Sequence, residues 1–457
     1  MHRRHLLQFI SAILFSSVSS RYLNTANANE IPPNPLRIVV IGAGLAGLAA
    51  ARELHHYGHQ VVVIEARDRI GGRIWTSRQW PDLPLDLGAS WIHGVRDNPL
   101  TAIADDIQAR RLTTRYASAT TYNTDGRALS RAQTDRLDRL RQQIFQALKQ
   151  AQNGEADQSI RETIKPLIQG LDQASEPYRW LNFILSGAIE QEYAGSAADL
   201  STYWYNSGQA LGGGDVLFPE GYGAITDFLA RDLPIELDQP VQTIEWGRSP
   251  LRVVTQRSEF IADRVVVTLP LGVLKAQAVQ FSPALPPPKQ EAIAKLGMGV
   301  LNKCYLRFPS VFWPEDVDWL EYIPARHGEW TEWVSFKHVA DQPILLGFNA
   351  ADRGKAIEAL SDAQIVASAM ETLKTIFGDG IPEPIEAQIT RWASDPFSLG
   401  SYSYNAVGST PKMRQALAAP LGQALFFAGE ASHGKFFATA HGAYLSGLRA
   451  ARQILAL

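Results

Sequence analysis

Two uninterrupted apolar runs mark the start of the folded chain. Residues 37–41 (RIVVI) and 60–66 (QVVVIEA) are rich in aliphatic, β-branched side chains without alternation, which is typical of parallel strands buried on both faces. Between them, residues 42–58 carry Leu and Ala at helical spacing and end at Gly58, a pattern that predicts a helix. Strand, helix and strand together predict a βαβ unit of about thirty residues.

Further along, helical and strand signals alternate. The β-branched runs at 241–246, 251–256 and 263–270 predict strands of a sheet. Ser409-Thr410-Pro411 is typical of a helix start, with a capping residue before a proline at the first helical position. The other expected elements are a helical region at 129–173, a rigid Pro-rich connector at 281–289, a strand at 299–308, and helices at 356–377 and 441–457.

Composition narrows the classes of partner. Charged residues make up 19% of the chain and the formal net charge is −3, so no strongly basic surface suited to DNA or RNA is expected. A mildly acidic protein is instead compatible with cationic ligands. Cys304 is the single cysteine, which excludes an internal disulfide and a cysteine-based metal site, and we expect no metal.

The first residues resemble an export signal. Residues 1–28 contain Arg3-Arg4, an apolar run from Leu6 to Val18 and the sequence Ala26-Asn27-Ala28, which is typical of a cleavage site. The paired arginines resemble a twin-arginine signal, so we expect export to a bacterial periplasm and no stable membrane span after processing. An ordinary secretory signal and an uncleaved anchor remain open, although the run is shorter than the roughly 20 apolar residues of a transmembrane helix.

A glycine motif at the first strand–helix junction predicts a dinucleotide site. Gly42, Gly44 and Gly47 follow the strand and open the helix, and Glu65 ends the next strand. In this pattern the glycines allow a tight turn and close approach to a pyrophosphate, while the acidic residue accepts hydrogen bonds from a ribose. The helix N-terminus adds unpaired N–H groups for the phosphates. The motif alone does not choose between NAD and FAD.

Three further segments resemble the flavin amine oxidase superfamily: EARDRIGGR at 65–73, DLGASWIHG at 86–94 and FFAGEASHG, followed by TAHGAYLSGLRAA, at 426–451. The resemblance is closest to FAD-dependent polyamine oxidases and extends to L-amino acid oxidases and histone lysine demethylases. It implies FAD, held non-covalently because Ser401 stands where monoamine oxidases carry the flavin-linking cysteine. The residues implied in cofactor binding are Gly42, Ala43, Gly44, Gly47, Glu65, Ala66, Arg67, Gly72, Arg73, Gly88, Ala89, Ser90, Trp91, Val241, Trp392, Gly429, Glu430, Thr439 and Ala440.

The same resemblance implies the residues of the reacting face. Lys303 matches the lysine that holds a water near the flavin N5 atom, His93 faces the substrate, and Tyr402 forms one wall of an aromatic cage. The second position of the cage is Thr439, which has no aromatic ring, so only one of the two cage walls is aromatic. The residues implied in substrate binding are Glu192 for a distal ammonium, Glu190 as the fallback, Trp91, Tyr193 and Thr439.

The resemblance implies an α/β fold with a discontinuous, Rossmann-like FAD-binding domain of the amine oxidase type. An α+β substrate-binding domain and a helical subdomain accompany it. The expected FAD-binding segments are 36–98, 221–303 and 398–457, and the expected substrate segments are 99–220 and 304–397, with a helical part at about 129–175.

We therefore expect an FAD-dependent amine oxidase that oxidises a polyamine of the spermidine or spermine type, with O₂ reduced to H₂O₂. An L-amino acid oxidase or dehydrogenase remains open, because Arg96 lies close to the position where such enzymes carry a carboxylate-binding arginine. A non-catalytic FAD-binding protein is the alternative from another class.

Overall fold

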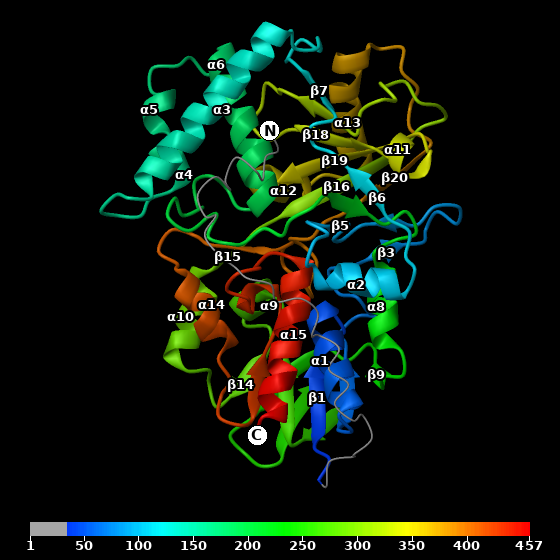
Figure 1. Cartoon of the computed structure of the whole chain (residues 1–457), viewed down its shortest axis with the longest axis vertical. Coiled ribbons are helices and arrows are strands. Elements are labelled where there is room, and N and C mark those ends of the chain that lie inside the picture. Colours follow the sequence, from blue (N-terminus) through cyan, green and yellow to red (C-terminus); the bar gives the residue numbers. More distant parts are fainter. Residues whose placement is uncertain (1–33) are drawn as a thin grey trace.

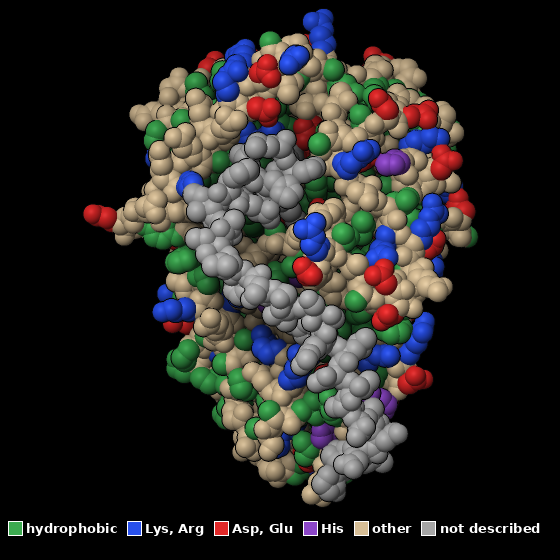
Figure 2. Space-filling model, in the orientation of Figure 1, with side chains coloured by type: hydrophobic (Ala, Val, Ile, Leu, Met, Phe, Trp, Pro, Cys, Tyr) green, Lys and Arg blue, Asp and Glu red, His purple; other side chains and the backbone are tan. Residues whose placement is uncertain are grey.

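The computed structural model describes residues 34–457, and the predicted export signal at 1–28 lies outside the described residues. Figure 1 shows two lobes: a lower one that contains both the first strand and the last helix, and an upper one built around a second sheet. No helix within residues 34–457 is long and apolar enough to cross a membrane. Figure 2 shows acidic and basic side chains interspersed over one face, without a continuous basic patch among the described residues.

The lower lobe is built on a parallel sheet drawn from distant parts of the chain. Its strand order is β22-β13-β1-β2-β9, and every neighbouring pair is parallel. The strands are β1 (Arg37–Ile41), β2 (Gln60–Ile64), β9 (Ile235–Glu236), β13 (Arg264–Val267) and β22 (Leu425–Phe427). The predicted discontinuous α/β fold is thereby confirmed, whereas the predicted domain boundaries stay a prediction.

Alternate residues of this sheet pack into two different cores. Ile38 and Val40 face α1 (Leu45–His56), α8 (Gly223–Ala230) and α15 (Ala440–Leu455). Val39 and Ile41 face the opposite core, to which a smaller sheet of order β12-β11-β10-β14 contributes. That second layer consists of β10 (Val241–Glu245), β11 (Leu251–Thr255), β12 (Glu259–Ala262), β14 (Gln280–Ser282), α9 (Leu271–Lys275), α10 (Pro287–Lys295) and α14 (Pro411–Ala418).

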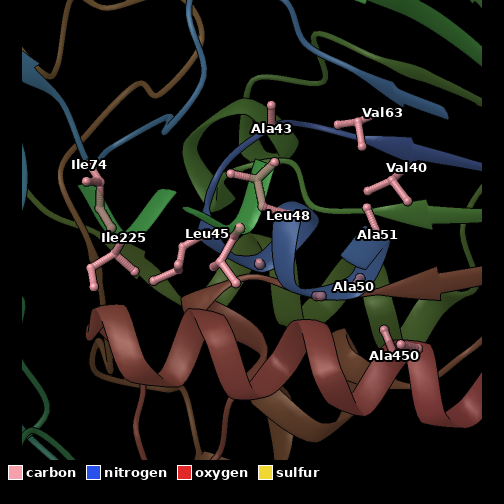
Figure 3. Packing of buried hydrophobic residues seen from close by; sticks show 14 of the residues in the cluster. Val40, Ala43, Leu45, Leu48, Ala50, Ala51, Val63, Ile74, Ile225 and Ala450 are labelled. Atoms are coloured by element: carbon pink, nitrogen blue, oxygen red, sulfur yellow. The ribbon is translucent and has the colours of Figure 1, made fainter. Parts of the chain in front are cut away.

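Helices α1 and α15 pack closely because small residues line their contact. Figure 3 shows Ala50 of α1 on the side that faces α15, which carries Ala450. At Gly447 of α15, a Cβ atom would lie 2.1 Å from the carbonyl oxygen of Ala46. Helices α1 and α15 are therefore held at a separation that only glycine permits at this point.

The upper lobe contains a six-stranded sheet of order β20-β16-β19-β18-β17-β7. Cys304 and Leu306 point toward α13 on one face, while Tyr305 points into the core on the other. The elements of this lobe are β7 (Ala119–Tyr122), β16 (Leu301–Arg307), β17 (Trp319–Tyr322), β18 (Glu332–Ser335), β19 (Ile344–Ala350), β20 (Glu386–Ile389), α11 (Phe336–Ala340), α12 (Ala351–Ile357) and α13 (Asp362–Phe377).

A helical part flanks this sheet, as expected. It comprises α3 (Arg131–Ala151), α4 (Ile160–Thr163), α5 (Lys165–Ile168), α6 (Glu176–Leu185), the π-helical turn η1 (Ser186–Glu190) and α7 (Gln191–Tyr193). Short elements between the lobes are β3 (Thr76–Ser77), β4 (Leu85–Asp86), β5 (Trp91–Ile92), β6 (Leu112–Thr114), β8 (Asp215–Leu217), β15 (Gly297–Met298), β21 (Ser403–Tyr404), α2 (Pro99–Asp106) and the 3₁₀ turn η2 (Glu430–Ser432).

Two expected elements are wrong in detail. The single helix at 356–377 is two helices, because Ser361 caps a new helix by accepting a hydrogen bond from the N–H of Gln364. The rigid connector at 281–289 contains most of β14 and the start of α10, which begins on Pro287. Proline fits the first turn of a helix as well as it fits a linker.

The contact between α1 and α15 yields a stability prediction. Gly447→Ala should lower the free energy of unfolding by about 1–3 kcal/mol, since the new methyl group overlaps a backbone carbonyl that packs tightly. Gly380→Ala is the matched control, because a Cβ atom there has nothing within 4 Å, and its effect should stay below about 0.5 kcal/mol. Urea unfolding of both variants measures the difference, and equal effects would contradict the account.

Candidate active site

A large cavity runs between the two lobes of the described chain. Its volume is about 1090 Å³, which slightly exceeds the ordinary range for drug-sized ligand pockets. Of the residues implied in cofactor binding, all line this cavity except Ala43, in the glycine turn, and Gly47, in the first turn of α1. Residues from both ends of the chain therefore meet at one site.

The glycine turn is held by its own strand–helix unit. Gly42 adopts a φ of +103°, and a Cβ atom on Gly47 would lie 1.9 Å from the carbonyl oxygen of Gly42. The buried Glu65 carboxylate accepts hydrogen bonds from the N–H groups of Ala43 (2.8 Å) and Arg67 (3.0 Å). Glu65 thus fixes the turn, and it also lines the cavity where the sequence motif predicts a ribose contact.

Glu430 joins the C-terminal segment to the N-terminal motif. Its carboxylate accepts hydrogen bonds from Arg73 (2.9 Å), the Ser403 hydroxyl (2.7 Å) and the N–H of Ala438 (3.0 Å). Burial acts to raise the pKa of this carboxyl group, but Arg73, Ser403 and Arg414 outweigh it and lower the pKa. Glu430 therefore stays ionised at the junction.

The backbone beside Glu430 leaves room for a bound group. Gly429 has a φ of +122°, and a Cβ atom there would meet nothing within 4 Å, although Gly429 lines the cavity. The N-terminus of α15 lies at the same cavity, with Thr439 capping it through the N–H of Gly442 (3.0 Å). Open glycine backbone, an arginine and a helix N-terminus suit a dinucleotide with an anionic pyrophosphate.

Lys303 is buried on β16 and contacts the loop after β4. Its ammonium donates hydrogen bonds to the carbonyl oxygens of Asp86 (2.7 Å) and Gly88 (2.6 Å) and to the Ser90 hydroxyl oxygen. Burial lowers the pKa of Lys303 to about 7, although the Asp86 carboxyl group acts to raise it. Burial also raises the pKa of Asp86, to about 6, against the Thr76 hydroxyl and Lys303. Asp86 opens the 86–94 segment singled out above, but sequence reasoning assigned it no role.

His93 is fixed by Asp215, a second residue that sequence reasoning missed. The Nδ1 atom of His93 lies 3.1 Å from a carboxylate oxygen of Asp215, whose other oxygen accepts from the N–H of Gly94 (2.8 Å). The imidazole also stacks on Trp91 at a centroid distance of 6.2 Å. His93 and Trp91 both line the cavity, so the imidazole is oriented at its wall.

Tyr402, Glu192, Tyr193 and Thr439 line the cavity, as the predictions require, but Glu190 does not. The Glu190 carboxylate accepts from the N–H of Ala197 (3.0 Å) and lies 2.7 Å from Nε2 of His327. Glu190 thus faces Ala197 and His327 and not the cavity, while its role as a substrate-binding fallback stays a prediction. Side chains two residues apart on a helical segment point to different sides, so Glu190 and Glu192 do not share a face.

The cavity also contains an aromatic chamber that the sequence did not reveal. Trp319 stacks on Trp91 (6.1 Å between centroids), on Phe348 (6.2 Å) and on Tyr116 (4.5 Å). All four rings line the cavity, together with the carboxylate-bearing Glu332, which is 3% exposed. These residues come from β5, β17, β18, β19 and the loop before β7, so no local motif marks them.

The lowered pKa of Lys303 predicts how the free energy of unfolding depends on pH. Between its folded pKa of about 7 and its ordinary value of 10.5, the unfolded chain binds a proton that the folded protein has lost. The free energy of unfolding should therefore gain a term that rises with pH across this window. Lys303→Met removes that term.

Urea unfolding of the wild type and of Lys303→Met, at several pH values from about 7 to about 10, measures this contribution to the free energy of unfolding. The difference in unfolding free energy, wild type minus Lys303→Met, should increase with pH. Titrating groups away from Lys303 are common to both proteins and cancel. Loss of Lys303 raises the pKa of Asp86 further, which adds to the difference in the same direction. A difference that stays constant would contradict a depressed pKa for Lys303.

The chain was compared with known proteins. Residues 45–455 match the family profile described as flavin containing amine oxidoreductase. "Polyamine oxidase 2" of Arabidopsis thaliana is 33% identical over 91% of this chain and 87% of the relative. "Lysine-specific histone demethylase 1 homolog 2" of the same plant is 34% identical over 92% of this chain. The chain spans only 52–58% of the length of this and the next curated demethylase relative.

A solved structure shares the fold. Putrescine oxidase bound to putrescine superposes with a TM-score of 0.75, covering 93% of this chain and 100% of that one, at 21% identity. The family match confirms the predicted FAD cofactor, and the residues around Gly429 fit it. From the glycine turn at one end to α15 at the other, this chain belongs to the flavin-containing amine oxidoreductase family.

Proposed function

We propose that this protein is an FAD-dependent oxidase of polyamines of the spermidine or spermine type. In the net reaction, a carbon next to a substrate nitrogen loses a hydride and the nitrogen loses a proton, which gives an imine. Water hydrolyses the imine to an aldehyde and an amine. O₂ takes up the two electrons and two protons and leaves as H₂O₂. FAD supplies the acceptor for the hydride when it is bound.

The observation that carries this proposal is the composition of the cavity beyond the flavin-binding residues. Trp91, Trp319, Phe348 and Tyr402 supply apolar walls, while Glu192 and Glu332 supply carboxylates. Aromatic faces and carboxylates together suit a chain of methylene groups that carries ammonium ions. The similarity to a protein named polyamine oxidase supports the same substrate class.

The residues at the wall have separate tasks in this proposal. Asp215 holds Nδ1 of His93, so that Nε2 is the ring nitrogen available to accept the proton of a substrate ammonium. The Tyr402 hydroxyl donates to the carbonyl oxygen of Gln191 (2.6 Å), which fixes its ring as one side of the amine site. Lys303 holds the loop at 86–90 in place and lines the cavity beside it.

Ser401 supports non-covalent binding of FAD. Its hydroxyl donates to the carbonyl oxygen of Leu301 (3.1 Å) and accepts from the N–H of the same residue (2.8 Å). The side chain at this position is thus used to hold the backbone of β16. We also propose export through the N-terminal signal, which rests on the sequence of residues 1–28 alone.

An amino acid substrate is the second candidate, favoured by one observation. Arg96, on which the sequence-based alternative rested, is not among the cavity-lining residues within 34–457, but Arg141 of α3 is. Arg141 donates to Asp138 on the same helix (2.7 Å), so a carboxylate-binding arginine there would compete with an existing ion pair. Binding of a polyamine does not require the ion pair between Arg141 and Asp138 to break.

Anaerobic reduction of the flavin tests the proposed function. Purified holoprotein is mixed with spermine, spermidine, arginine or lysine, and the flavin absorbance is followed. Bleaching by the polyamines alone is expected. Bleaching by the amino acids alone would replace the proposal with an amino acid oxidase, and no bleaching by any of the four would contradict it.

His93→Asn tests the proton-accepting role within the same assay. The variant keeps a polar side chain but loses the imidazole, so flavin reduction by spermidine should slow by about 100-fold, within the usual range for a general base. The loss should shrink at high pH, where the substrate amine is already neutral. A loss that does not depend on pH would contradict proton acceptance by His93.

A further inference from the structure

Arg414 of α14 is 0% exposed, which is rare for an arginine. Its Nε atom donates a hydrogen bond to the Asn405 side-chain oxygen (3.0 Å), and Nη1 donates to the Ser403 hydroxyl (2.8 Å) and to the carbonyl oxygen of Ala431 (3.1 Å). The other terminal nitrogen, Nη2, is buried and has no hydrogen-bond partner within residues 34–457. The amine chemistry proposed above makes no use of this side chain.

The charges around Arg414 are mostly positive. The Ser403 hydroxyl accepts a hydrogen bond from Arg414 and donates one to the Glu430 carboxylate (2.7 Å). Glu430 also forms the ion pair with Arg73 (2.9 Å). Arg449 of α15 binds the same turn, η2, by donating to one of its carbonyl oxygens (2.9 Å). Three guanidinium groups thus surround one carboxylate at η2.

This surplus of positive charge calls for an anion. Burial lowers the pKa of Arg414 to about 9, although Glu430 acts to raise it, so the guanidinium keeps its proton at neutral pH. A buried charge that lacks a full counter-charge destabilises a fold. Arg73, Gly429 and Glu430 line the cavity, so an anion bound there would complete the cluster.

Arg414 also supports the cavity wall through Phe437. The central carbon of the guanidinium lies 3.8 Å from the centroid of the Phe437 ring, within the range of a cation–π interaction. Phe437 lines the cavity, and Arg414 is not among the lining residues in the described part of the chain. The next residue, Ala438, has a φ of +60° and donates to Glu430 (3.0 Å). The strained turn before α15 is thus held by Arg414 and Glu430 together.

We propose that Arg414 is a positioning residue for FAD, and that the negative charge of the FAD pyrophosphate completes the buried cluster at η2. Arg414 acts from behind the wall, through Phe437 and Glu430, and its charge acts at a distance because the protein interior screens it less than water does. The inference concerns how FAD is retained, so it does not depend on which amine the enzyme oxidises.

Release of FAD from the holoenzyme tests the proposal. Each holoenzyme is diluted in steps, and the fluorescence of released flavin gives the dissociation constant for FAD. Arg414→Gln removes the charge but keeps a hydrogen-bonding end, and it should weaken FAD binding by about 10-fold or more. Arg414→Lys keeps the charge and should stay within about threefold of the wild type.

Lys412→Gln is the matched control. Lys412 lies two residues before Arg414 on the same helix but is exposed, so this variant loses the same charge on the solvent side. Water and salt screen that charge, and the dissociation constant for FAD should change by less than about twofold. Arg414→Met is a second neutral variant and should behave as Arg414→Gln does. Circular dichroism and the thermal midpoint at saturating FAD establish that each variant is folded.

The lysine variant separates charge from shape. Weakened FAD binding in the neutral variants, with affinity kept in Arg414→Lys and Lys412→Gln, supports the inference. Unchanged affinity in a folded neutral variant would overturn it. An equal loss in Arg414→Lys would also overturn it, because the shape of the guanidinium and not its charge would then hold FAD. If both neutral variants fail to fold while Arg414→Lys folds, the fold itself needs the charge, and the inference is likewise wrong.

Discussion

The ion pair between Arg73 and Glu430 is the interaction on which the assembled site depends. It joins the N-terminal motif to the segment before α15, and Ser403 and the N–H of Ala438 bind the same carboxylate. A buried charge is tolerated only when it is paired and hydrogen-bonded. Because Arg73 lies 357 residues before Glu430, this part of the cavity wall forms only when the two ends of the fold meet.

A second connection ties the upper sheet to this junction. Lys303 and Tyr305, two residues apart on β16, both donate hydrogen bonds to the carbonyl oxygen of Asp86. The loop at 86–90 leads directly to Trp91 and His93. The sheet that carries Phe348 and Glu332 is thus fixed relative to the flavin-binding residues by contacts to the backbone.

The sequence allowed the cofactor half of the site to be predicted because its signals are local. The glycine turn, the strand before it and Glu65 lie within thirty residues, and the family resemblance linked them to Gly429 and Glu430. The remaining residues of the site could not be predicted, because they meet only through pairing of segments far apart in the sequence. Asp215 meets His93, and Glu332 meets Phe348, only through strand register, which no local pattern encodes. Helical phase likewise directs Glu190 to His327 and away from the cavity, which the sequence did not indicate.

The central claim is that a polyamine lies in the cavity between the lobes, with a reacting nitrogen beside His93. A crystal structure of the holoenzyme with a bound, non-reacting polyamine analogue tests it most directly. The account predicts one nitrogen within hydrogen-bond distance, about 3 Å, of Nε2 of His93, and the methylene chain against the Trp319 and Phe348 rings. An analogue bound outside this cavity, or with no nitrogen near His93, would contradict it.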